Sequence, residues 1–302
     1  MSEQRFIVLD WGSTNIRAFL CTNEQVQEVK KSHEGVTVFH GADCEGVFER
    51  LCGPWLEEYG PMKTVMAGMV GSVNGWIDAP YLPCPTDLGA LASKLCPVPN
   101  QRNLSIHVIP GLCVKAADNC NVMRGEETQL AGVIQQGQGK YKLCIMPGTH
   151  CKWVAINGST VETFRTAMTG ELHSILMQYS LVGLGTPQQE QDPTIFTQAL
   201  ERGLHENNVM AHLFEVRAGR ILGQIPAHLA GEYLSGLLIG AEVASMLRLF
   251  QISQSEDPVA IVANPFLAQR YSQALEMVGI KSQSLDGDQC FLQGVMPLAA
   301  QI

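Results

Sequence analysis

Two stretches of the chain share one pattern, and this repeat limits the folds that the sequence can adopt. Residues 6–20 and 142–156 each contain a buried apolar strand, a short polar turn and a second apolar strand. When Gly12 is aligned with Gly148, the apolar flanks of the two turns also come into register. A repeat separated by about one domain length indicates two related domains rather than a solenoid. Strand and helix patterns alternate along the chain and favour an α/β fold built on two sheets.

The first turn carries residue types that suit a phosphate group and a divalent cation. Asp10 ends the buried strand, and its carboxylate can hold hydrated Mg²⁺. Gly12 lets a ligand approach the backbone closely. Ser13, Thr14 and Asn15 supply side-chain and backbone donors that can form a nest for phosphate oxygens. An ordinary β-hairpin with a polar turn explains this stretch equally well by itself. Two such turns, one in each domain, instead suggest a nucleotide in the cleft between the domains.

Composition is typical of a globular protein and excludes some partners. The chain has 302 residues, of which 46% are hydrophobic and 16% charged, so two domains can each form a core. The net charge of −9 opposes binding to nucleic acid or to an anionic membrane. Residues 1–5 lead directly into the first strand without a signal sequence. The ten cysteines contain no Cys-x-x-Cys pair, so we expect reduced thiols and a cytoplasmic protein.

The segment from Gly137 to Lys140 is polar and just precedes the repeat. We therefore predict domains over residues 1–138 and 139–302. A helix is expected from Gly125 to Gln136, with two acids in its first turn. The acids could provide a catalytic base, or they could only interact favourably with the helix dipole. Further helices are expected over Cys44–Tyr59, after Thr86-Asp87 and through Leu95, and, as a long buried helix, over Leu229–Phe250.

Several motifs together resemble a known family. The pattern Asp10-x-Gly12-x-Thr14-Asn15 resembles the first phosphate motif of the superfamily of actin, sugar kinases and Hsp70 chaperones. Gly148-Thr149-His150 resembles a divergent second phosphate motif. Within this superfamily the chain is most similar to the 2-dehydro-3-deoxygalactonokinase family. The stretches that carry this resemblance span nearly the whole chain: residues 10–15, 66–72, 109–114, 121–130, 146–153, 168–173 and 235–246.

The resemblance implies an actin-like ATPase fold of two ribonuclease H-like domains. Each domain would be a mixed sheet flanked by helices, with a cleft between the domains. The first domain would hold the first phosphate turn and the sugar acid, and the second domain would hold the nucleotide. The implied activity is a carbohydrate kinase, which uses ATP and Mg²⁺ to convert 2-dehydro-3-deoxy-D-galactonate to its 6-phosphate. The sugar acid and ATP would be its partners, and a homodimer is left open.

The same resemblance assigns roles to particular residues. Asp10 would hold the metal. Glu127, or with less support Glu126, would be the base, by similarity to the Gly-Glu-Glu turn of the exopolyphosphatase branch. Arg124 would bind the substrate carboxylate or pair with an acid. Gly71 and Ser72 lie in a loop at a strand end and would contact the sugar acid. The residues expected to bind the ATP phosphates are Gly12, Ser13, Thr14, Asn15, Gly148, Thr149, His150 and Lys152.

Two departures from the superfamily pattern are visible. Met146 stands where many members keep an Asp before the second phosphate turn, and Ala263-Asn264-Pro265 stands where a Gly-Gly turn usually holds adenosine. Three alternative functions therefore stay in view. One is a phosphatase of the exopolyphosphatase type, and another is a kinase for the gluconate-derived epimer. The third is a non-catalytic module switched by ATP, although such proteins carry large insertions for which 302 residues leave little room.

Overall fold

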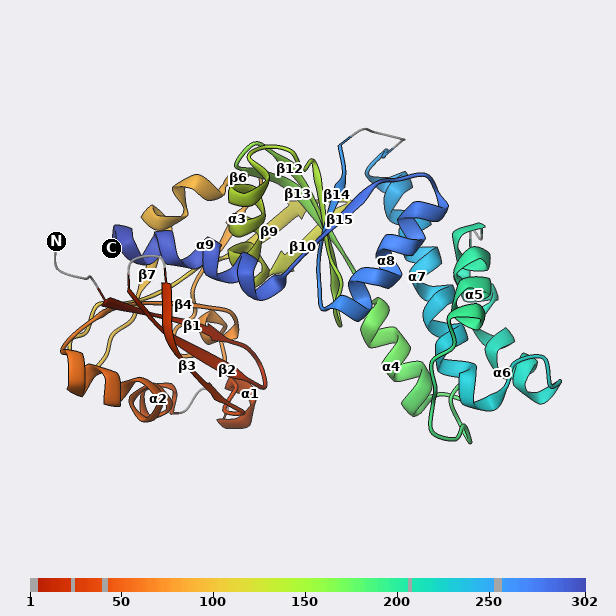
Figure 1. Cartoon of the computed structure of the whole chain (residues 1–302), viewed down its shortest axis with the longest axis horizontal. Helices are drawn as coiled ribbons and strands as arrows, with labels where there is room; N and C mark the ends of the chain where they lie inside the picture. The colour runs from red at the N-terminus through yellow and green to blue at the C-terminus, as the bar shows by residue number, and fades with distance from the viewer. Residues whose placement is uncertain (1–4, 23–24, 40–42, 206–207, 253–256) are drawn as a thin grey trace. The chain divides into compact units, whose positions relative to one another are not determined.

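The computed structural model describes residues 5–22, 25–39, 43–205, 208–252 and 257–302 (Figure 1). The chain divides into two compact units. Unit 1 comprises Met1–Gly139, Ile156–Thr163 and Gly287–Ile302, and unit 2 comprises Lys140–Ala155 and Phe164–Asp286. The first segment of unit 1 ends one residue after the predicted boundary at 138. The assignment of separate functions to residues 1–138 and 139–302 stays a prediction.

Unit 1 is built on a mixed sheet with the strand order β3-β2-β1-β4-β8-β7. Strands β1, β2 and β3 form an antiparallel meander, whereas β1, β4 and β8 run parallel. Residues 6–9 of β1 are apolar and fully buried, as expected for a central strand covered on both faces. The strands are β1 (Arg5–Trp11), β2 (Ile16–Thr22), β3 (Gln25–Ser32), β4 (Lys63–Ala67), β7 (Cys96–Pro97) and β8 (Ile106–Val108).

Helices cover this sheet. The predicted helix over residues 44–59 is confirmed as α2 (Cys44–Tyr59), which packs Val47, Phe48 and Trp55 into the core beside the strands. Helix α3 (Glu126–Gly137) packs against α9 (Gly287–Gln301), where two glycines allow the backbones to approach closely. A short helix, α1 (Val36–Phe39), and two 3₁₀ helices, η1 (Met69–Gly71) and η2 (Leu88–Lys94), complete the helical part of unit 1.

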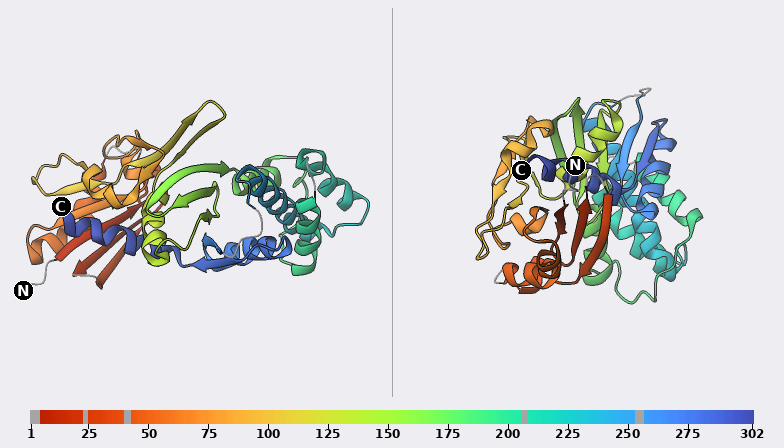
Figure 2. Two further views of the ribbon diagram at one scale, coloured as in Figure 1. Left: turned by 90° about the horizontal axis from the view of Figure 1, so that it is seen from above. Right: turned by 60° about the vertical axis from the view of Figure 1, so that its left-hand side comes forward.

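One part of unit 1 differs from the sequence prediction. Strands β9 (Gly111–Ala116) and β10 (Asn119–Met123) form a hairpin, and β5 (Tyr81–Pro83) pairs parallel with β9 (Figure 2). The expected helix from Thr86-Asp87 through Leu95 is confirmed as the 3₁₀ helix η2, which starts directly after Asp87 and ends at Lys94. Residues 86–87 also form the short strand β6 (Thr86–Asp87), which pairs with residues 160–161. Asp87 caps η2 by accepting a hydrogen bond from Gly89 N at 2.9 Å.

Unit 2 contains a second mixed sheet, in which β15, β14 and β11 are parallel and β12 is antiparallel to β11. Trp153 and Tyr271 are buried in its core and both donate hydrogen bonds to the buried carboxylate of Glu242. These two hydrogen bonds offset part of the cost of burying the Glu242 carboxylate. The strands are β11 (Leu143–Met146), β12 (Cys151–Asn157), β13 (Thr160–Ala167), β14 (Val259–Val262) and β15 (Ser282–Leu285).

The helices of unit 2 surround one long buried helix, α7 (Ala230–Leu249), which the sequence predicted. Glycines at its contact with α5 bring the two backbones together, since a Cβ on Gly240 would lie 2.4 Å from Leu200 O. The other helices are α4 (Thr169–Tyr179), α5 (Pro193–His205), α6 (Leu213–Ile221), α8 (Pro265–Met277), η3 (Val209–Ala211) and η4 (Ala227–Leu229). Among the described residues, no helix is long and apolar enough to cross a membrane. The predicted α/β class, with mixed sheets flanked by helices, is confirmed.

Candidate active site

The first phosphate turn connects β1 to β2, and its backbone is oriented by α1. The carbonyl oxygens of Gly12, Ser13 and Thr14 accept hydrogen bonds at 3.0–3.2 Å from the N–H groups of Val36, Thr37 and Gly35 respectively. In a trans peptide the N–H points opposite to the C=O. The N–H groups of residues 13–15 therefore point away from α1 and toward solvent. A Cβ at position 35 would lie 2.2 Å from Ser13 O, so this approach needs glycine.

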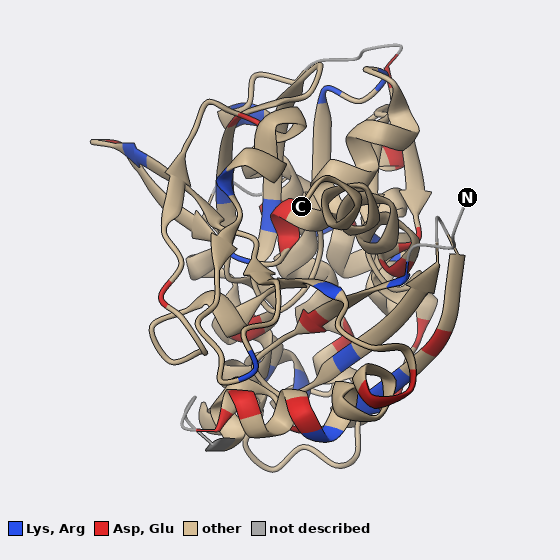
Figure 3. Cartoon of the chain, turned by 90° about the vertical axis from the view of Figure 1, so that its left-hand side faces the viewer, with Lys and Arg blue, Asp and Glu red and all other residues tan. Residues whose placement is uncertain are grey.

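A cavity of about 540 Å³ opens beside this turn. It is lined by Asp10, by Gly12, Thr14 and Asn15 of the turn, and by residues that were not selected from the sequence, which are Ile16, Arg17, Lys31, Ser32 and His33. His33 Nδ1 lies 2.8 Å from Asn15 Oδ1, and Asn15 Nδ2 donates to Thr14 Oγ1 at 2.9 Å. Figure 3 marks the Lys and Arg positions and the Asp and Glu positions along the ribbon, and both kinds occur in many parts of the chain.

Asp10 has a partner that the sequence analysis did not identify. Arg17 lies directly opposite Asp10 in the β1–β2 register. Arg17 donates to Asp10 Oδ2 from Nη2 at 2.6 Å and from Nε at 3.2 Å. The Asp10 side chain is 32% exposed and still borders the cavity. A cation therefore already lies beside the carboxylate that is predicted to bind metal.

The ends of two parallel strands bring Asp10 to the same sheet edge as the acidic turn, residues 124–127 at the start of α3. Asp10 pairs with Ala67, the last residue of β4, and Gly68 follows. A Cβ on Gly68 would lie 2.7 Å from Trp11 O, and a Cβ on Gly125 would lie 3.4 Å from the Cα of Gly68. Both glycines have positive φ angles, +97° and +105°, which other residues rarely adopt. The backbone before α3 is thus packed against the ends of β1 and β4, where ligands of open α/β sheets bind.

The two acids of the α3 turn have different environments. Glu127 is fully buried, and both of its carboxylate oxygens accept from Gly125 N, at 2.7 and 2.9 Å. Burial, and to a lesser extent the charge of Glu126, raise the pKa of Glu127 to about 8. Glu126 is partly exposed and its Oε2 accepts from Arg124 N at 3.0 Å. A carboxyl with a pKa near neutrality is suited to proton transfer, so Glu127 keeps its place as the predicted base.

The three residues predicted to bind the sugar acid lie close to this turn. Arg124 is 8% exposed and stacks on the Tyr81 ring, with its Cζ 4.2 Å from the ring centroid. Its Nη2 donates to Ala79 O at 2.6 Å, whereas its Nη1 is buried without a hydrogen-bond partner among the described residues. A Cβ on Gly71 would lie 2.9 Å from that Nη1. Ser72 is buried and donates to Met69 O at 2.7 Å.

The second phosphate turn joins β11 to β12 and is held by the first turn of α4. Glu171 N donates to Thr149 O at 3.0 Å, and Glu171 Oε2 lies 2.6 Å from His150 Nε2. A Cβ on Gly170 would lie 2.5 Å from Gly148 O, so α4 packs directly on this backbone. Lys152 is buried and its ammonium donates to Thr166 Oγ1 at 3.1 Å. Lys152 is therefore anchored to the neighbouring strand.

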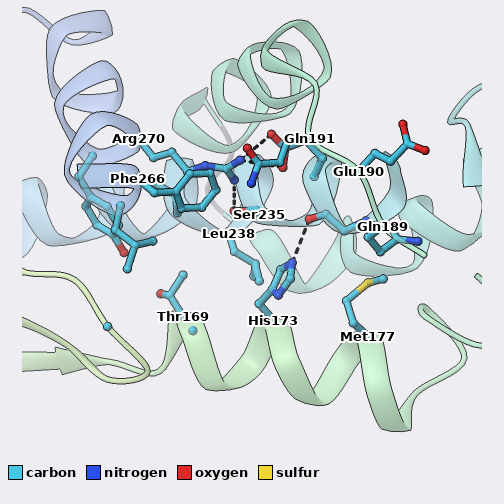
Figure 4. Close-up of a pocket in the computed structure, with 17 residues that line it drawn as sticks. Thr169, His173, Met177, Gln189, Glu190, Gln191, Ser235, Leu238, Phe266 and Arg270 are labelled. Atoms are coloured by element: carbon cyan, nitrogen blue, oxygen red, sulfur yellow. Dashed lines mark hydrogen bonds and ion pairs between the residues drawn. The ribbon is translucent and has the colours of Figure 1, made fainter. Parts of the chain in front are cut away.

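A cavity of about 400 Å³ in unit 2 begins at Gly148 of this turn and continues between α4, α7 and α8 (Figure 4). Arg270 lies between the rings of Phe196 and Phe266, with its Cζ 4.2 and 4.1 Å from their centroids. It pairs with the buried carboxylate of Glu232 at 2.6 Å and donates to Ser235 Oγ at 2.8 Å. Apolar side chains of the lining include Met177, Leu238, Ile239 and Phe266.

Several residues of these sites were not selected from the sequence. Pairing the residues of the first hairpin one by one across its turn places Arg17 opposite Asp10, and would have identified Arg17 as its partner. The segments 168–173 and 235–246 were marked only by resemblance, although they supply His173 and Ser235 to the lining of the unit 2 cavity. Phe266 and Arg270 belong to α8, which follows strand β14 at the place where the superfamily pattern puts a nucleotide-binding turn. His33 had no local sequence signal.

Comparisons with known proteins cover almost the whole chain. A family model described as 2-keto-3-deoxy-galactonokinase matches residues 10–298. A 2-dehydro-3-deoxygalactonokinase from Escherichia coli (strain K12) is 44% identical over 98% of this chain and 97% of its own length. The crystal structure of a Sinorhizobium meliloti protein assigned to the same activity is 30% identical. It has a TM-score of 0.89 and covers 97% of this chain and 98% of that one.

A more distant likeness concerns the fold alone. The activator of the 2-hydroxyisocaproyl-CoA dehydratase from Clostridium difficile, solved with bound ADPNP, has a TM-score of 0.52 at 11% identity, over 98% of this chain and 95% of that one. The predicted actin-like ATPase fold is confirmed. The match of the family model and the identity of the Escherichia coli relative extend from the first phosphate turn to α9. The chain belongs to the 2-keto-3-deoxy-galactonokinase family.

Proposed function

We propose that this protein transfers the γ-phosphoryl group of ATP to the 6-hydroxyl of 2-dehydro-3-deoxy-D-galactonate, in the catabolism of D-galactonate. The observation that carries this proposal is the family relationship over residues 10–298, which includes the two phosphate turns. Phosphoryl transfer depends mainly on positioning and on stabilising the charge of the transferred oxygens. The donors of the two turns are suited to these tasks.

The unit 2 cavity is the candidate site for the nucleoside. It combines apolar walls with a few polar groups, which suits an adenine ring and a ribose. It reaches Gly148, so a nucleoside in it would place its phosphates near the second phosphate turn. Phe266, which is 43% exposed, offers a free ring surface for a base to contact. Asn264 caps α8 by accepting from Leu267 N at 3.0 Å. Asn264 and Pro265 thus begin α8 and replace the expected glycine turn.

The residues at Asp10 fit a magnesium ion. A partly exposed carboxylate at the edge of a cavity that Thr14 also lines offers oxygen ligands of the kind that Mg²⁺ prefers. Arg17 Nη2 donates to Asp10 Oδ2, so the ion would share this carboxylate with a guanidinium. Bound Mg²⁺ would neutralise part of the charge on the ATP phosphates. Asp10 would hold the ion, and the N–H groups of residues 13–15 would bind phosphate oxygens.

The acidic turn and Arg124 are the candidate sugar-acid site. Glu127 would accept the proton of the attacking hydroxyl, supported by its raised pKa of about 8. The unpaired Nη1 of Arg124 is a buried donor, and a carboxylate oxygen of the sugar acid would satisfy it. Because Gly71 lacks a side chain, the guanidinium can lie against its backbone. These assignments agree with a negatively charged substrate rather than with a neutral sugar.

A coupled ADP-release assay tests the proposed activity. It would compare 2-dehydro-3-deoxy-D-galactonate, its gluconate-derived epimer, glycerol, glucose and polyphosphate at saturating ATP and Mg²⁺. We expect the highest kcat/KM for the galactonate-derived acid and a measurable but lower value for its epimer, because discrimination depends on what meets one moved hydroxyl. A higher kcat/KM for the epimer or for a neutral sugar would refute the substrate. Release of phosphate without any sugar acid would instead indicate a phosphatase.

The oligomeric state belongs to the same proposal. A homodimer remains a prediction, and sedimentation equilibrium with and without ATP measures it directly. A polymer that forms only with ATP would support the non-catalytic alternative.

A further inference from the structure

Arg17 lies between two carboxylates that are far apart in the sequence. Its Nη2 and Nε donate to Asp10, and its Nη1 donates to Asp288 Oδ1 at 2.5 Å. The three side chains belong to unit 1 and differ in exposure. Asp288 is 65% exposed, whereas Arg17 and Asp10 are 24% and 32% exposed. The guanidinium is therefore bound on its inner side by the predicted metal ligand and on its outer side by the first turn of α9.

The fold fixes Asp288 in this position. Arg17 and Phe19 are two residues apart on β2 and so project from the same face of the strand. Asp288 and Phe291 are three apart on α9 and share one side of the helix. The rings of Phe19 and Phe291 are in contact, with centroids 6.0 Å apart, next to the Arg17–Asp288 ion pair. Gln129 also donates from α3 to Gly287 O at 3.2 Å, which ties down the start of α9.

The position of Arg17 creates a competition at Asp10. Both hydrogen bonds from Arg17 end on Oδ2 of Asp10. A divalent cation bound to either oxygen of this carboxylate would be repelled by the nearby guanidinium. Arginine does not lose its proton in proteins, so this repulsion decreases only when the guanidinium moves away. Movement away from Asp10 costs less if another carboxylate continues to pair with the guanidinium. Asp288 provides that second partner.

We propose that Asp288 is a positioning residue. It holds the Arg17 guanidinium on the side away from Asp10, so that a divalent cation can bind the Asp10 carboxylate. This inference rests on the proposed role of Asp10 as the metal ligand. Its simpler alternative is that Asp288 only stabilises the N-terminus of α9 through the helix dipole. The two roles differ in a measurable way. An effect of Asp288 that comes from stabilising α9 would persist in a variant without Arg17. An effect that comes from holding Arg17 would disappear in that variant.

Binding of Mn²⁺ in the presence of ADP, counted by electron paramagnetic resonance of the free ion, tests the proposal without turnover. The full-length chain would carry Asp288→Asn, Arg17→Gln or both substitutions. Glu57→Gln, which neutralises an exposed carboxylate of α2, is the charge control. We expect Asp288→Asn to weaken Mn²⁺ binding about two- to fivefold, the range of a partly exposed ion pair. Mn²⁺ alone should bind more tightly to Arg17→Gln than to the wild type.

The double variant gives the decisive result. If Asp288 acts through Arg17, Asp288→Asn changes Mn²⁺ affinity in the wild-type background and leaves it unchanged in the Arg17→Gln background. Equal weakening in both backgrounds, or none in the wild type, would overturn the proposal. The variant Asp10→Asn distinguishes a failure of the metal assignment from a failure of the proposed role of Asp288. Loss of Mn²⁺ binding in this variant supports the metal site regardless of Asp288, whereas wild-type binding would refute both the metal assignment and the role of Asp288.

Discussion

The carboxylate of Asp10 is the side chain on which the predicted phosphoryl transfer most depends. In Asp10→Asn, Arg17 keeps its second ion pair with Asp288, so the fold should lose no more than about 1 kcal/mol. Turnover at saturating Mg·ATP should nevertheless fall by orders of magnitude, because the amide is a poor ligand for Mg²⁺. Circular dichroism would confirm folding, and the ADP-release assay would measure the loss. Near-wild-type turnover would remove Asp10 from the metal site.

Glu127 should make stability depend on pH. Its pKa is raised to about 8 in the folded protein, from an ordinary value of 4.5, because the carboxyl is buried. The folded state therefore binds a proton more tightly than the unfolded state. The contribution of Glu127 to the free energy of unfolding should be greatest below pH 4.5, fall as the pH rises, and become level above about pH 8. Urea denaturation across this range would measure the slope, which should be smaller in Glu127→Gln. Identical slopes would mean that Glu127 is not the group that titrates.

Comparison of the two neighbouring acids tests the choice of base. Glu127→Gln should lower kcat far more than it weakens ATP binding, since the amide cannot accept the proton of the sugar-acid hydroxyl. Glu126→Gln should have a smaller effect, because Glu126 Oε2 only accepts from the backbone of Arg124. Steady-state kinetics and ATP titration would be run on both variants. Mild and equal effects would indicate that the turn merely provides a favourable helix start.

At the scale of residues, the sequence indicated which side chains could carry out the chemistry, but it did not indicate which side chains they contact. The phosphate turn, the acidic turn and Arg124 could each be selected from local patterns. The partner of Asp10 required the register of a hairpin, and Asp288 required the packing of α9 onto β2. The burial of Glu127, which sets its pKa, depends on contacts made by residues far away in the sequence. No local pattern contains that information.

The crossing of α3 and α9 offers a test at the scale of elements. A Cβ on Gly132 would lie 1.9 Å from Cys290 O, and a Cβ on Gly294 would lie 1.9 Å from Thr128 O. Gly132→Ala should therefore push the helices apart and cost about 1–3 kcal/mol or more of stability. Gln135→Ala, at an exposed position of the same helix, should change stability by no more than about 0.5 kcal/mol. Denaturant melts of the two variants would check this, and equal stabilities would contradict the close packing.

Elements with a strong local pattern were predicted well. The strands of the two phosphate hairpins, α2 and α7 each have a clear apolar period, and the structure places them within a few residues of the expected bounds. The β9–β10 hairpin was missed because β10 is short and polar, and β9 gains its pairing from β5, a distant segment that contains prolines. The helix expected before Leu95 is present as the 3₁₀ helix η2, and Asp87 caps it as the local helix-start signal indicates. The pairing of Thr86 and Asp87 with residues 160–161 is a non-local contact that no local pattern predicts.

At the scale of the whole molecule, the two phosphate turns have the same design in separate units. Each joins two antiparallel strands, and each is held from behind by the first turn of a helix, α1 in unit 1 and α4 in unit 2. The repeat that was visible in the sequence is thus a repeat of structure. The supporting helices were not part of that signal, since residues 34–39 and 168–173 share no pattern.

If both turns bind the phosphates of one ATP, we expect substrate binding to bring the two domains together around Gly137–Lys140. Gln138 and Gly139 adopt positive φ angles there, 47° and 86°, so the segment already departs from regular structure. We expect X-ray scattering to report a smaller radius of gyration with a non-hydrolysable ATP analogue and the sugar acid together than with either alone. Asp10→Asn, whose metal site is impaired, serves as the control and should compact less. Superimposable curves for the wild type in all conditions would mean that one ATP does not engage both turns by closure.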